Sequence, residues 1–278
     1  MKRILTIQDI SCLGKCSITV ALPILSAMGI ETVIQPTAVL STHTMVNGFT
    51  VMDLTDQRLP ICEHWKWEVV TFVASYTGYL GSAEEIAIVE KIFEDFGTGE
   101  TLKFVDPVMA DNGKLYPAFD MAYAKLNAKL CGKADIIVPN LTEACFMTDS
   151  EYKTEYDEDY LKGILEKLAK LGAKKVVLTG AQLSKGKTGV YGLDTETGEF
   201  FQYQHDLIDA SYHGTGDVFS SVSIGGILRG LSLVEAFGIA GDYTALTIEE
   251  TLKNPKKPWY GVDFEATLPK LIHRLEAL

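Results

Sequence analysis

The strongest constraint on the fold is the alternation of short apolar runs with longer segments of helical periodicity. The strand-like runs are RILTI, ETVIQPTAVL, VVTFVAS, LKFVDPV, DIIVP and KKVVLTG, and the helical segments between them are CSITVALPILSAMG, IAIVEKIFEDF, MAYAKLNAKLC and YLKGILEKLAKLG. A compact β-branched run such as VVTFVAS is typical of a strand buried on both faces. This order predicts an α/β fold, with a central, mostly parallel sheet and helices on both of its faces.

The later part of the chain departs from this alternation. Residues 188–207, TGVYGLDTETGEFFQYQHDL, have the pattern of strand, polar turn and strand, which predicts a late β-hairpin. Three helical stretches follow, at 215–230, 232–252 and 262–277. Because no linker, repeat or low-complexity tract interrupts the chain, we expect a single α/β domain over residues 1–278.

The overall composition limits the class of partner. The formal net charge is −12, which argues against a protein that binds duplex nucleic acid. It is compatible with a small anionic substrate, because helix N-termini bind anions even on an acidic protein. Gln8 and Asp9 interrupt the first apolar run, and no stretch has the length of a membrane span. We therefore expect a cytoplasmic protein without a membrane partner, with five irregularly spaced cysteines as reduced thiols.

The stretch GTGD, residues 214–217, precedes an apolar helical segment at the cost of two flexible glycines. In parallel α/β sheets, ligands bind at the carboxyl ends of the strands and at nearby helix N-termini. Gly214, Thr215 and Gly216 would expose N–H groups as an anion hole for a phosphoryl group, and Asp217 could act as a general base. The alternative is that Thr215 or Asp217 simply caps the helix.

Carboxylates also follow two strand-like runs. Asp106 in VDPVMAD comes at a strand end, where a carboxylate suits a magnesium ion or its waters, although Asp-Pro is also a common turn. Asn140 and Glu143 in VPNLTEA lie three apart at a strand-to-helix junction. Both could reach one metal–phosphate site, and a simple helix cap is the alternative.

The earlier strand ends carry hydroxyl, imidazole and phenol groups that suit a small polar or aromatic substrate. These residues are Asp9, Ser11, His43, Thr44, Tyr76 and Tyr79. For His43 the alternative is a buried histidine whose ring is satisfied within the core. For Tyr79 it is packing at a glycine-rich turn.

The segment GAQLSKGKT, residues 180–188, is similar to a phosphate-binding P-loop but has five residues before Gly-Lys-Thr where that loop has four. It also precedes a strand-like run, whereas a P-loop opens a helix. We therefore expect Lys185 and Lys187 to belong to a solvated basic loop.

Five motifs, STHT, GYLGS, VDPVM, PNLTE and GTGD, occur in this order over most of the chain. Together they resemble the ribokinase-like superfamily, and within it the pyridoxal/pyridoxamine kinases. The resemblance implies ATP-dependent phosphorylation of the hydroxymethyl group of a B6 vitamer in vitamin B6 salvage. It also implies Mg²⁺ with ATP as co-substrate, K⁺ as a further candidate ion, and a homodimer.

The resemblance also assigns roles by motif. Asp217 would be the general base, and the backbone of residues 214–217 the anion hole. The predicted nucleotide and metal residues are Asp106 and Glu143 for Mg²⁺ and the phosphates, Asn140 beside them, and Thr179 and Gly180 near the nucleotide. The predicted vitamer residues are Asp9, His43, Thr44 and Tyr79.

Two positions depart from the family pattern. Asp9 stands where many members have serine, and Ala110 where glycine is usual. Both bear on substrate preference more than on the reaction. The alternatives are a kinase for hydroxymethylpyrimidine or another small alcohol of the same superfamily, and a nucleotide- or vitamin-binding protein without catalysis.

Overall fold

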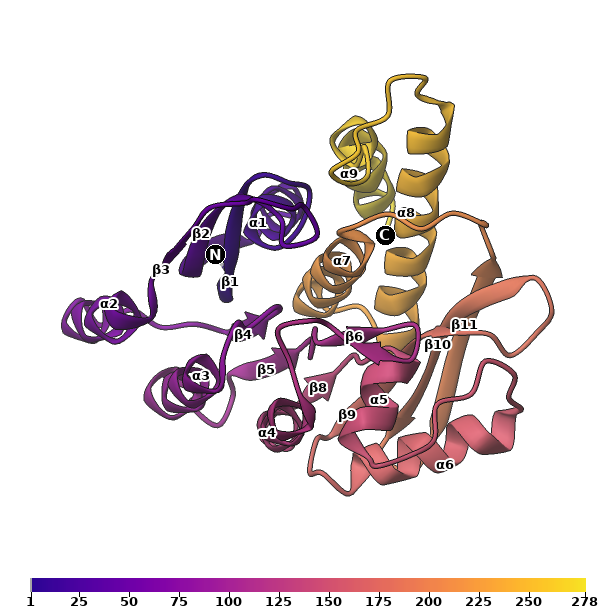
Figure 1. The fold of residues 1–278 in the computed structure, drawn as a ribbon, viewed down its shortest axis with the longest axis horizontal. Coiled ribbons are helices and arrows are strands. Elements are labelled where there is room, and N and C mark those ends of the chain that lie inside the picture. The colour runs from indigo at the N-terminus through magenta and orange to yellow at the C-terminus, as the bar shows by residue number, and fades with distance from the viewer. Residues whose placement is uncertain (1) are drawn as a thin grey trace. The chain divides into compact units, whose positions relative to one another are not determined.

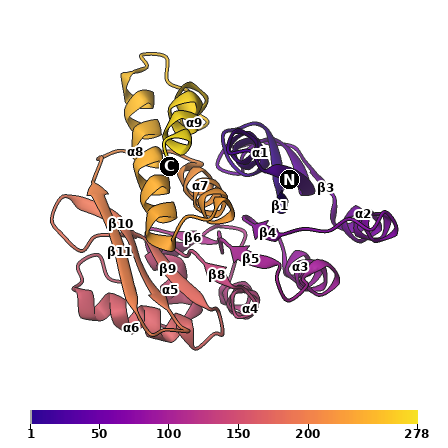
Figure 2. The ribbon, with the colours of Figure 1, turned by 180° about the vertical axis from the view of Figure 1, so that it is seen from behind.

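A computed structural model describes residues 2–278, which form two compact units (Figures 1 and 2). Unit 1 consists of the chain up to Thr71 together with Leu207–Leu278, and unit 2 consists of Phe72–Asp206. Both are α/β units. The expectation of a single domain over the whole chain stays a prediction.

The sheet of unit 1 has the order β1-β2-β3. Its strands are β1 (Arg3–Leu13), β2 (Glu31–Thr42) and β3 (Val51–Asp53). The pair β1 and β2 is parallel, whereas β3 pairs with β2 in antiparallel orientation. Between β1 and β2 the chain forms α1 (Ile18–Ala27), whose apolar side packs on both strands (Figure 1). After β3 it forms α2 (Thr55–Trp67), which contacts β2.

The C-terminal part of unit 1 is helical. It contains α7 (Thr215–Arg229), α8 (Leu233–Lys253), the short 3-10 helix η1 (Glu265–Thr267) and α9 (Leu268–Glu276). Small residues let α7 approach its neighbours closely. A Cβ added to Gly225 would lie 2.4 Å from the sulfur of Met28, and one added to Gly226 would lie 3.1 Å from the Cβ of Ala236 in α8. The small-residue run SSVSIGG thus brings α7 close to α1 and α8.

The sheet of unit 2 has the order β11-β10-β9-β8-β5-β4. Its strands are β4 (Ala74–Thr77), β5 (Leu102–Val105), β8 (Ile136–Ile137), β9 (Lys175–Ala181), β10 (Lys187–Asp194) and β11 (Phe200–Asp206). The first four are parallel, and the last two form the antiparallel hairpin expected from the sequence. A separate small ribbon is formed by β6 (Ala110–Asp111) and β7 (Lys114–Leu115).

Four helices run side by side along one face of the sheet of unit 2 (Figures 1 and 2). They are α3 (Ala83–Phe96), α4 (Met121–Cys131), α5 (Leu141–Met147) and α6 (Glu158–Ala169). Side chains of Ser82, Asp120, Asn140 and Asp157 cap their N-termini. Each of these hydrogen bonds satisfies a backbone N–H that the helix itself leaves unpaired.

Two local expectations are corrected by the structure. The run VVTFVAS is mostly not a strand, because α2 ends just before it and Val69 takes a φ of 54°, so β4 begins only at Ala74. The sequence analysis also missed α2 itself. Only Arg58 and Cys62 of that helix are buried, so its apolar periodicity is weak. Among residues 2–278 there is no helix with the length and apolarity to cross a membrane.

Candidate active site

The N-terminus of α7 is left open. Its N-cap is Gly214 in the left-handed conformation (φ 84°), and no side chain caps the helix, so neither Thr215 nor Asp217 is the cap. A Cβ on Gly214 would lie 1.7 Å from the carbonyl oxygen of Lys15, so only glycine fits there. A Cβ on Gly216 would meet no atom within 4 Å. The first turn therefore presents N–H groups and an open face, which together favour an anion.

Asp217 lies in the first turn of α7, three residues after the N-cap. Its charge and that of Asp9 both act on the buried Cys16. Burial, and then these two carboxylates, raise the pKa of the Cys16 thiol. The thiol therefore stays protonated, and the role of Asp217 as a general base stays a prediction.

Asp9 lies in β1, is buried, and is held by two neighbouring hydroxyl groups. Its two carboxylate oxygens accept hydrogen bonds from the hydroxyls of Ser17, at 2.5 Å, and Ser11, at 2.9 Å. Burial raises the pKa of Asp9, and these hydrogen bonds oppose that shift. Ser17 is the N-cap residue of α1, but its hydroxyl accepts no capping hydrogen bond from that helix. The carboxylate thus fixes the loop between β1 and α1, and its predicted contact with a substrate stays a prediction.

A cluster of three rings lies in the same unit. The ring centroids of His43 and His213 are 4.1 Å apart in a stacked arrangement, and that of Trp259 is 6.2 Å from His43. His43 is buried, and neither of its ring nitrogens has a hydrogen-bond partner among residues 2–278. The alternative of a satisfied core histidine is therefore wrong. Desolvation lowers the pKa of His43, against the opposing charge of Asp9.

His213 and Trp259 were missed by the sequence analysis. His213 directly precedes GTGD, so its position beside the motif could have drawn attention to it. It remains exposed, yet desolvation and the nearby His43 lower its pKa. Thr44, the neighbour of His43 in the turn after β2, is exposed.

In unit 2, Glu143 is tied to the backbone. Asn140 and Glu143 form a reciprocal capping box at the start of α5, which is the alternative that the sequence left open. Glu143 Oε2 accepts from the N–H of Asn140 at 2.9 Å, and Oε1 accepts from the N–H of Met109 at 3.0 Å and from that of Ala110 at 3.5 Å. The capping box thus also holds the loop that follows Asp106.

Asp106 and Glu143 interact electrostatically. Both are buried, and burial together with the charge of Asp106 raises the pKa of Glu143. Within the described part of the chain no group of three His, Cys, Asp or Glu side chains could form a metal cage. The two carboxylates of Asp106 and Glu143 are of the oxygen-donor type that Mg²⁺ prefers, and the predicted role of this pair stays a prediction.

The other predicted residues of unit 2 lie near this pair or beside Phe119. Thr179 at the end of β9 forms a parallel bridge with Asn140, and Gly180 next to it (φ 68°) has open space around its Cα. The Tyr79 ring lies 5.5 Å from that of Phe119, so packing accounts for part of its position.

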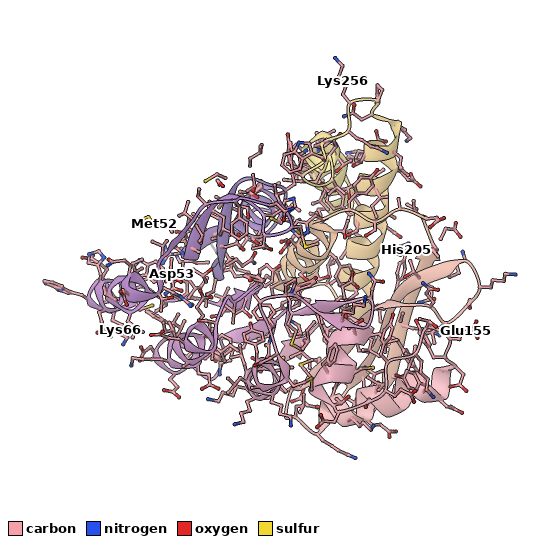
Figure 3. All side chains as sticks on the ribbon, in the orientation of Figure 1. Met52, Asp53, Lys66, Glu155, His205 and Lys256 are labelled. Atoms are coloured by element: carbon pink, nitrogen blue, oxygen red, sulfur yellow. The ribbon has the colours of Figure 1, made fainter. Side chains whose placement is uncertain are left out.

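The segment that is similar to a P-loop leads into strand β10, as expected, and not into a helix. Lys187 pairs with the exposed Asp206, at 2.8 Å between Nζ and Oδ1. His205, the neighbour of Asp206 on β11, is half-buried (Figure 3). Residues 182–186 between β9 and β10 therefore form the connecting loop that holds Lys185, whereas Lys187, also predicted in the loop, already lies in β10.

Comparisons with known proteins place the chain among small-molecule kinases. A family model described as phosphomethylpyrimidine kinase matches residues 24–259. The chain belongs to this family. It is therefore an ATP-dependent phosphotransferase with an alcohol acceptor, and the resemblance drawn from the five motifs is confirmed.

Three relatives illustrate the range of the family. The hydroxymethylpyrimidine/phosphomethylpyrimidine kinase of Bacillus subtilis is 28% identical over 78% of each chain. A Bacteroides thetaiotaomicron protein provisionally assigned as a phosphomethylpyrimidine kinase, crystallised with pyridoxal, is 38% identical with a TM-score of 0.91, over 99% of this chain and 96% of its own. The pyridoxal kinase of Lactobacillus plantarum is 30% identical with a TM-score of 0.91, over 100% and 99%. These similarities confirm the predicted fold class.

Proposed function

We propose that this kinase phosphorylates the hydroxymethyl group of a B6 vitamer (pyridoxal, pyridoxamine or pyridoxine) in vitamin B6 salvage. The observation that carries the proposal is the open N-terminus of α7, with Asp217 three residues after Gly214. Phosphoryl transfer needs positioning and charge stabilisation more than covalent chemistry, so N–H groups, a metal and one base suffice.

In the proposed reaction, Asp217 accepts the hydroxyl proton of the acceptor. The acceptor oxygen bonds to the γ-phosphorus, the bond from that phosphorus to the bridging oxygen of the β-phosphate breaks, and ADP leaves. The N–H groups of residues 214–217 stabilise the negative charge of the moving phosphoryl group.

Asp106 and Glu143 are proposed to hold Mg²⁺, with Asn140, Thr179 and Gly180 near the nucleotide. Their oxygen donors match the preference of the ion, and the hydrogen bonds from Asn140, Met109 and Ala110 fix Glu143 in place. When bound, Mg²⁺ would neutralise part of the phosphate charge.

The preference for a B6 vitamer is supported by the ring cluster of His43, His213 and Trp259. Two flat imidazoles and an indole suit a heteroaromatic acceptor, and the free ring nitrogens of His43 can bond to its polar substituents. The relatives crystallised with pyridoxal or named pyridoxal kinase support the same preference. Asp9, Thr44 and Tyr79 are proposed to complete the vitamer contacts.

Hydroxymethylpyrimidine is the second candidate acceptor, favoured by the family model and by the Bacillus subtilis relative. It is also a heteroaromatic ring with a hydroxymethyl group. The proposed chemistry at Asp217 is the same for both acceptors, so only a direct comparison of substrates separates them.

The test is ADP release from ATP with pyridoxal, pyridoxamine, pyridoxine, hydroxymethylpyrimidine and ribose, with and without Mg²⁺ and K⁺, for the wild type and Asp217→Asn. We expect the highest kcat/KM with a B6 vitamer. We expect Asp217→Asn to lower kcat by roughly 100-fold or more, the range for a lost general base. A higher kcat/KM for hydroxymethylpyrimidine would replace the acceptor assignment. ATP binding without turnover of any acceptor would favour a binding protein.

A homodimer and a cytoplasmic location are also proposed. The exposed apolar residues Val51 and Met52 on β3, at the end of the sheet of unit 1, are compatible with a second copy pairing there (Figure 3). Light scattering on the purified protein would give its mass in solution.

A further inference from the structure

Three backbone segments of unit 1 meet at Lys15. The lysine N–H donates to the carbonyl of Tyr260 at 3.1 Å, and its own carbonyl lies against Gly214. A Cβ added to Gly261 (φ 143°) would lie 2.5 Å from the Cβ of Lys15 and 3.2 Å from the carbonyl oxygen of His213. The β1–α1 loop, the turn before α7 and the segment after α8 are therefore in direct contact, with glycines where they approach most closely.

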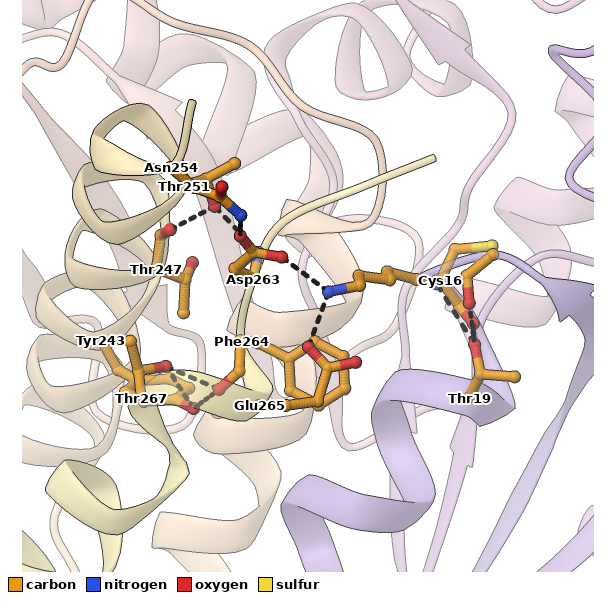
Figure 4. Close-up of polar contacts among 12 residues, drawn as sticks. Cys16, Thr19, Tyr243, Thr247, Thr251, Asn254, Asp263, Phe264, Glu265 and Thr267 are labelled. Carbon is orange, nitrogen blue, oxygen red and sulfur yellow. Dashed lines mark hydrogen bonds and ion pairs between the residues drawn. The ribbon is translucent and has the colours of Figure 1, made fainter. Parts of the chain in front are cut away.

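The side chain of Lys15 ties the same segments together. Its ammonium is 2.9 Å from Asp263 Oδ1 and 2.7 Å from Glu265 Oε2, and the side chain is only 12% exposed (Figure 4). Desolvation lowers the pKa of Lys15, but the hydrogen bonds that its ammonium donates to the two carboxylates outweigh this effect and raise the pKa, so the group stays charged. Such a mostly buried ammonium with two carboxylates holds its position far better than an exposed ion pair does.

The carboxylate end of this contact is anchored in turn. Asp263 Oδ2 accepts from Asn254 Nδ2 at 2.7 Å, and the N–H of Asp263 donates to the hydroxyl of Thr251 at 2.8 Å (Figure 4). Thr251 donates to the carbonyl of Thr247 within α8, at 2.6 Å. The chain of contacts thus runs from α8 through Asp263 and Lys15 to the backbone of Gly214.

We propose that Lys15 and Asp263 are positioning residues for phosphoryl transfer, which hold the Gly214 turn so that the N–H groups of α7 point at the transferring group. This inference rests on the proposed function. Neither side chain is placed in contact with a substrate. Their effect passes through the backbone of Lys15 and Gly214, because Gly214 leaves no free space between them. Small displacements of such donors lower the rate without removing the ground-state contacts of the substrate.

The experiment compares wild type, Lys15→Met, Lys15→Arg and the matched control Lys270→Met, whose lysine forms an exposed pair with Glu250. We expect Lys15→Met to lower kcat roughly 10- to 100-fold. The acceptor KM should stay within about threefold, since only interactions of the transition state are weakened. Lys15→Arg should recover most of kcat, because it restores charge and pairing. Lys270→Met should match the wild type. A merely structural role would lower the melting temperature and leave the kcat of folded molecules unchanged.

A wild-type kcat in folded Lys15→Met would overturn the inference. If Lys15→Met does not fold, the kcat of Asp263→Asn is measured instead. We expect it to be lower than that of the wild type, and an unchanged kcat would contradict the inference. If the wild-type protein phosphorylates none of the acceptors, this result contradicts the proposed function but not the positioning role of Lys15. The inference is then decided by hydrogen exchange at the amide of Val218, which donates to the carbonyl of Gly214 at 3.0 Å; Lys15→Met should accelerate this exchange and Lys270→Met should not. Equal exchange in all variants would overturn it.

Discussion

The N-termini of α7 in unit 1 and α5 in unit 2 share a spacing and differ in what satisfies them. Each has an acidic residue three positions after the N-cap, Asp217 after Gly214 and Glu143 after Asn140. In α5 the side chains of Asn140 and Glu143 each accept a hydrogen bond from the backbone N–H of the other residue. The Glu143 carboxylate also accepts from the N–H groups of Met109 and Ala110. In α7 no side chain caps the helix, and the space at Gly216 is open. The first arrangement fixes a carboxylate and the loop beside it, and the second leaves N–H donors that we propose bind the transferring group.

The largest effect on stability should come from a change at the capped N-terminus of α5. We expect Glu143→Gln to lower the free energy of unfolding by about 1–3 kcal/mol, because an amide cannot accept from all of these buried N–H groups. The melting temperature should fall by roughly 2–4 °C for each kcal/mol. Asp217→Asn serves as the matched variant. It should change the melting temperature less, because removing a charge near a helix N-terminus costs about 0.3–1 kcal/mol. Equal losses in both variants would contradict the distinction between the two helix ends.

A smaller effect should appear in the pH dependence of unit 1. The pKa of buried His43 is lowered by desolvation, against the charge of Asp9 and beside the ring of His213. The unfolded chain therefore binds a proton more readily, and the stability from neutral His43 is lost as pH falls below the ordinary histidine value of about 6.5.

We expect the free energy of unfolding of the wild type, measured by denaturant unfolding at each pH, to fall more steeply between pH 7 and 5 than that of His43→Phe, by at most about 1.4 kcal/mol per pH unit. His64→Phe is the control, because His64 is exposed near Glu68. Parallel curves for the wild type and His43→Phe would show that His43 is not an unsatisfied, uncharged group.

Local chemistry made parts of this molecule predictable. The helix α4 matches its predicted segment at both ends because Asp120 caps it and Gly132 follows it. The hairpin β10–β11 was predictable from two strand-like runs around a polar turn. By contrast, VVTFVAS has the composition of a buried strand, but Val69 and Val73 are exposed beside the end of α2, and no local pattern reveals that.

The candidate active site was likewise predictable only in part from the sequence. The motifs indicated Asp217, Asp106 and Glu143, but not how each is held. That Glu143 accepts from Met109 and Ala110, more than thirty residues earlier, depends on the fold. The contact of Lys15 with Asp263 joins residues 248 positions apart, so it too lay beyond local sequence patterns.

The central claim, that the open end of α7 binds the transferring phosphoryl group, is tested most directly by backbone amide NMR. Mg²⁺, ADP and pyridoxal are added first, and then aluminium fluoride as a mimic of that group. The account predicts that the fluoride step shifts the amide signals of Thr215, Gly216 and Asp217, while those of Leu233 and Val234, behind the capping box of Ser232 on α8, stay in place. Unchanged α7 signals in a complex that binds the mimic would contradict the account.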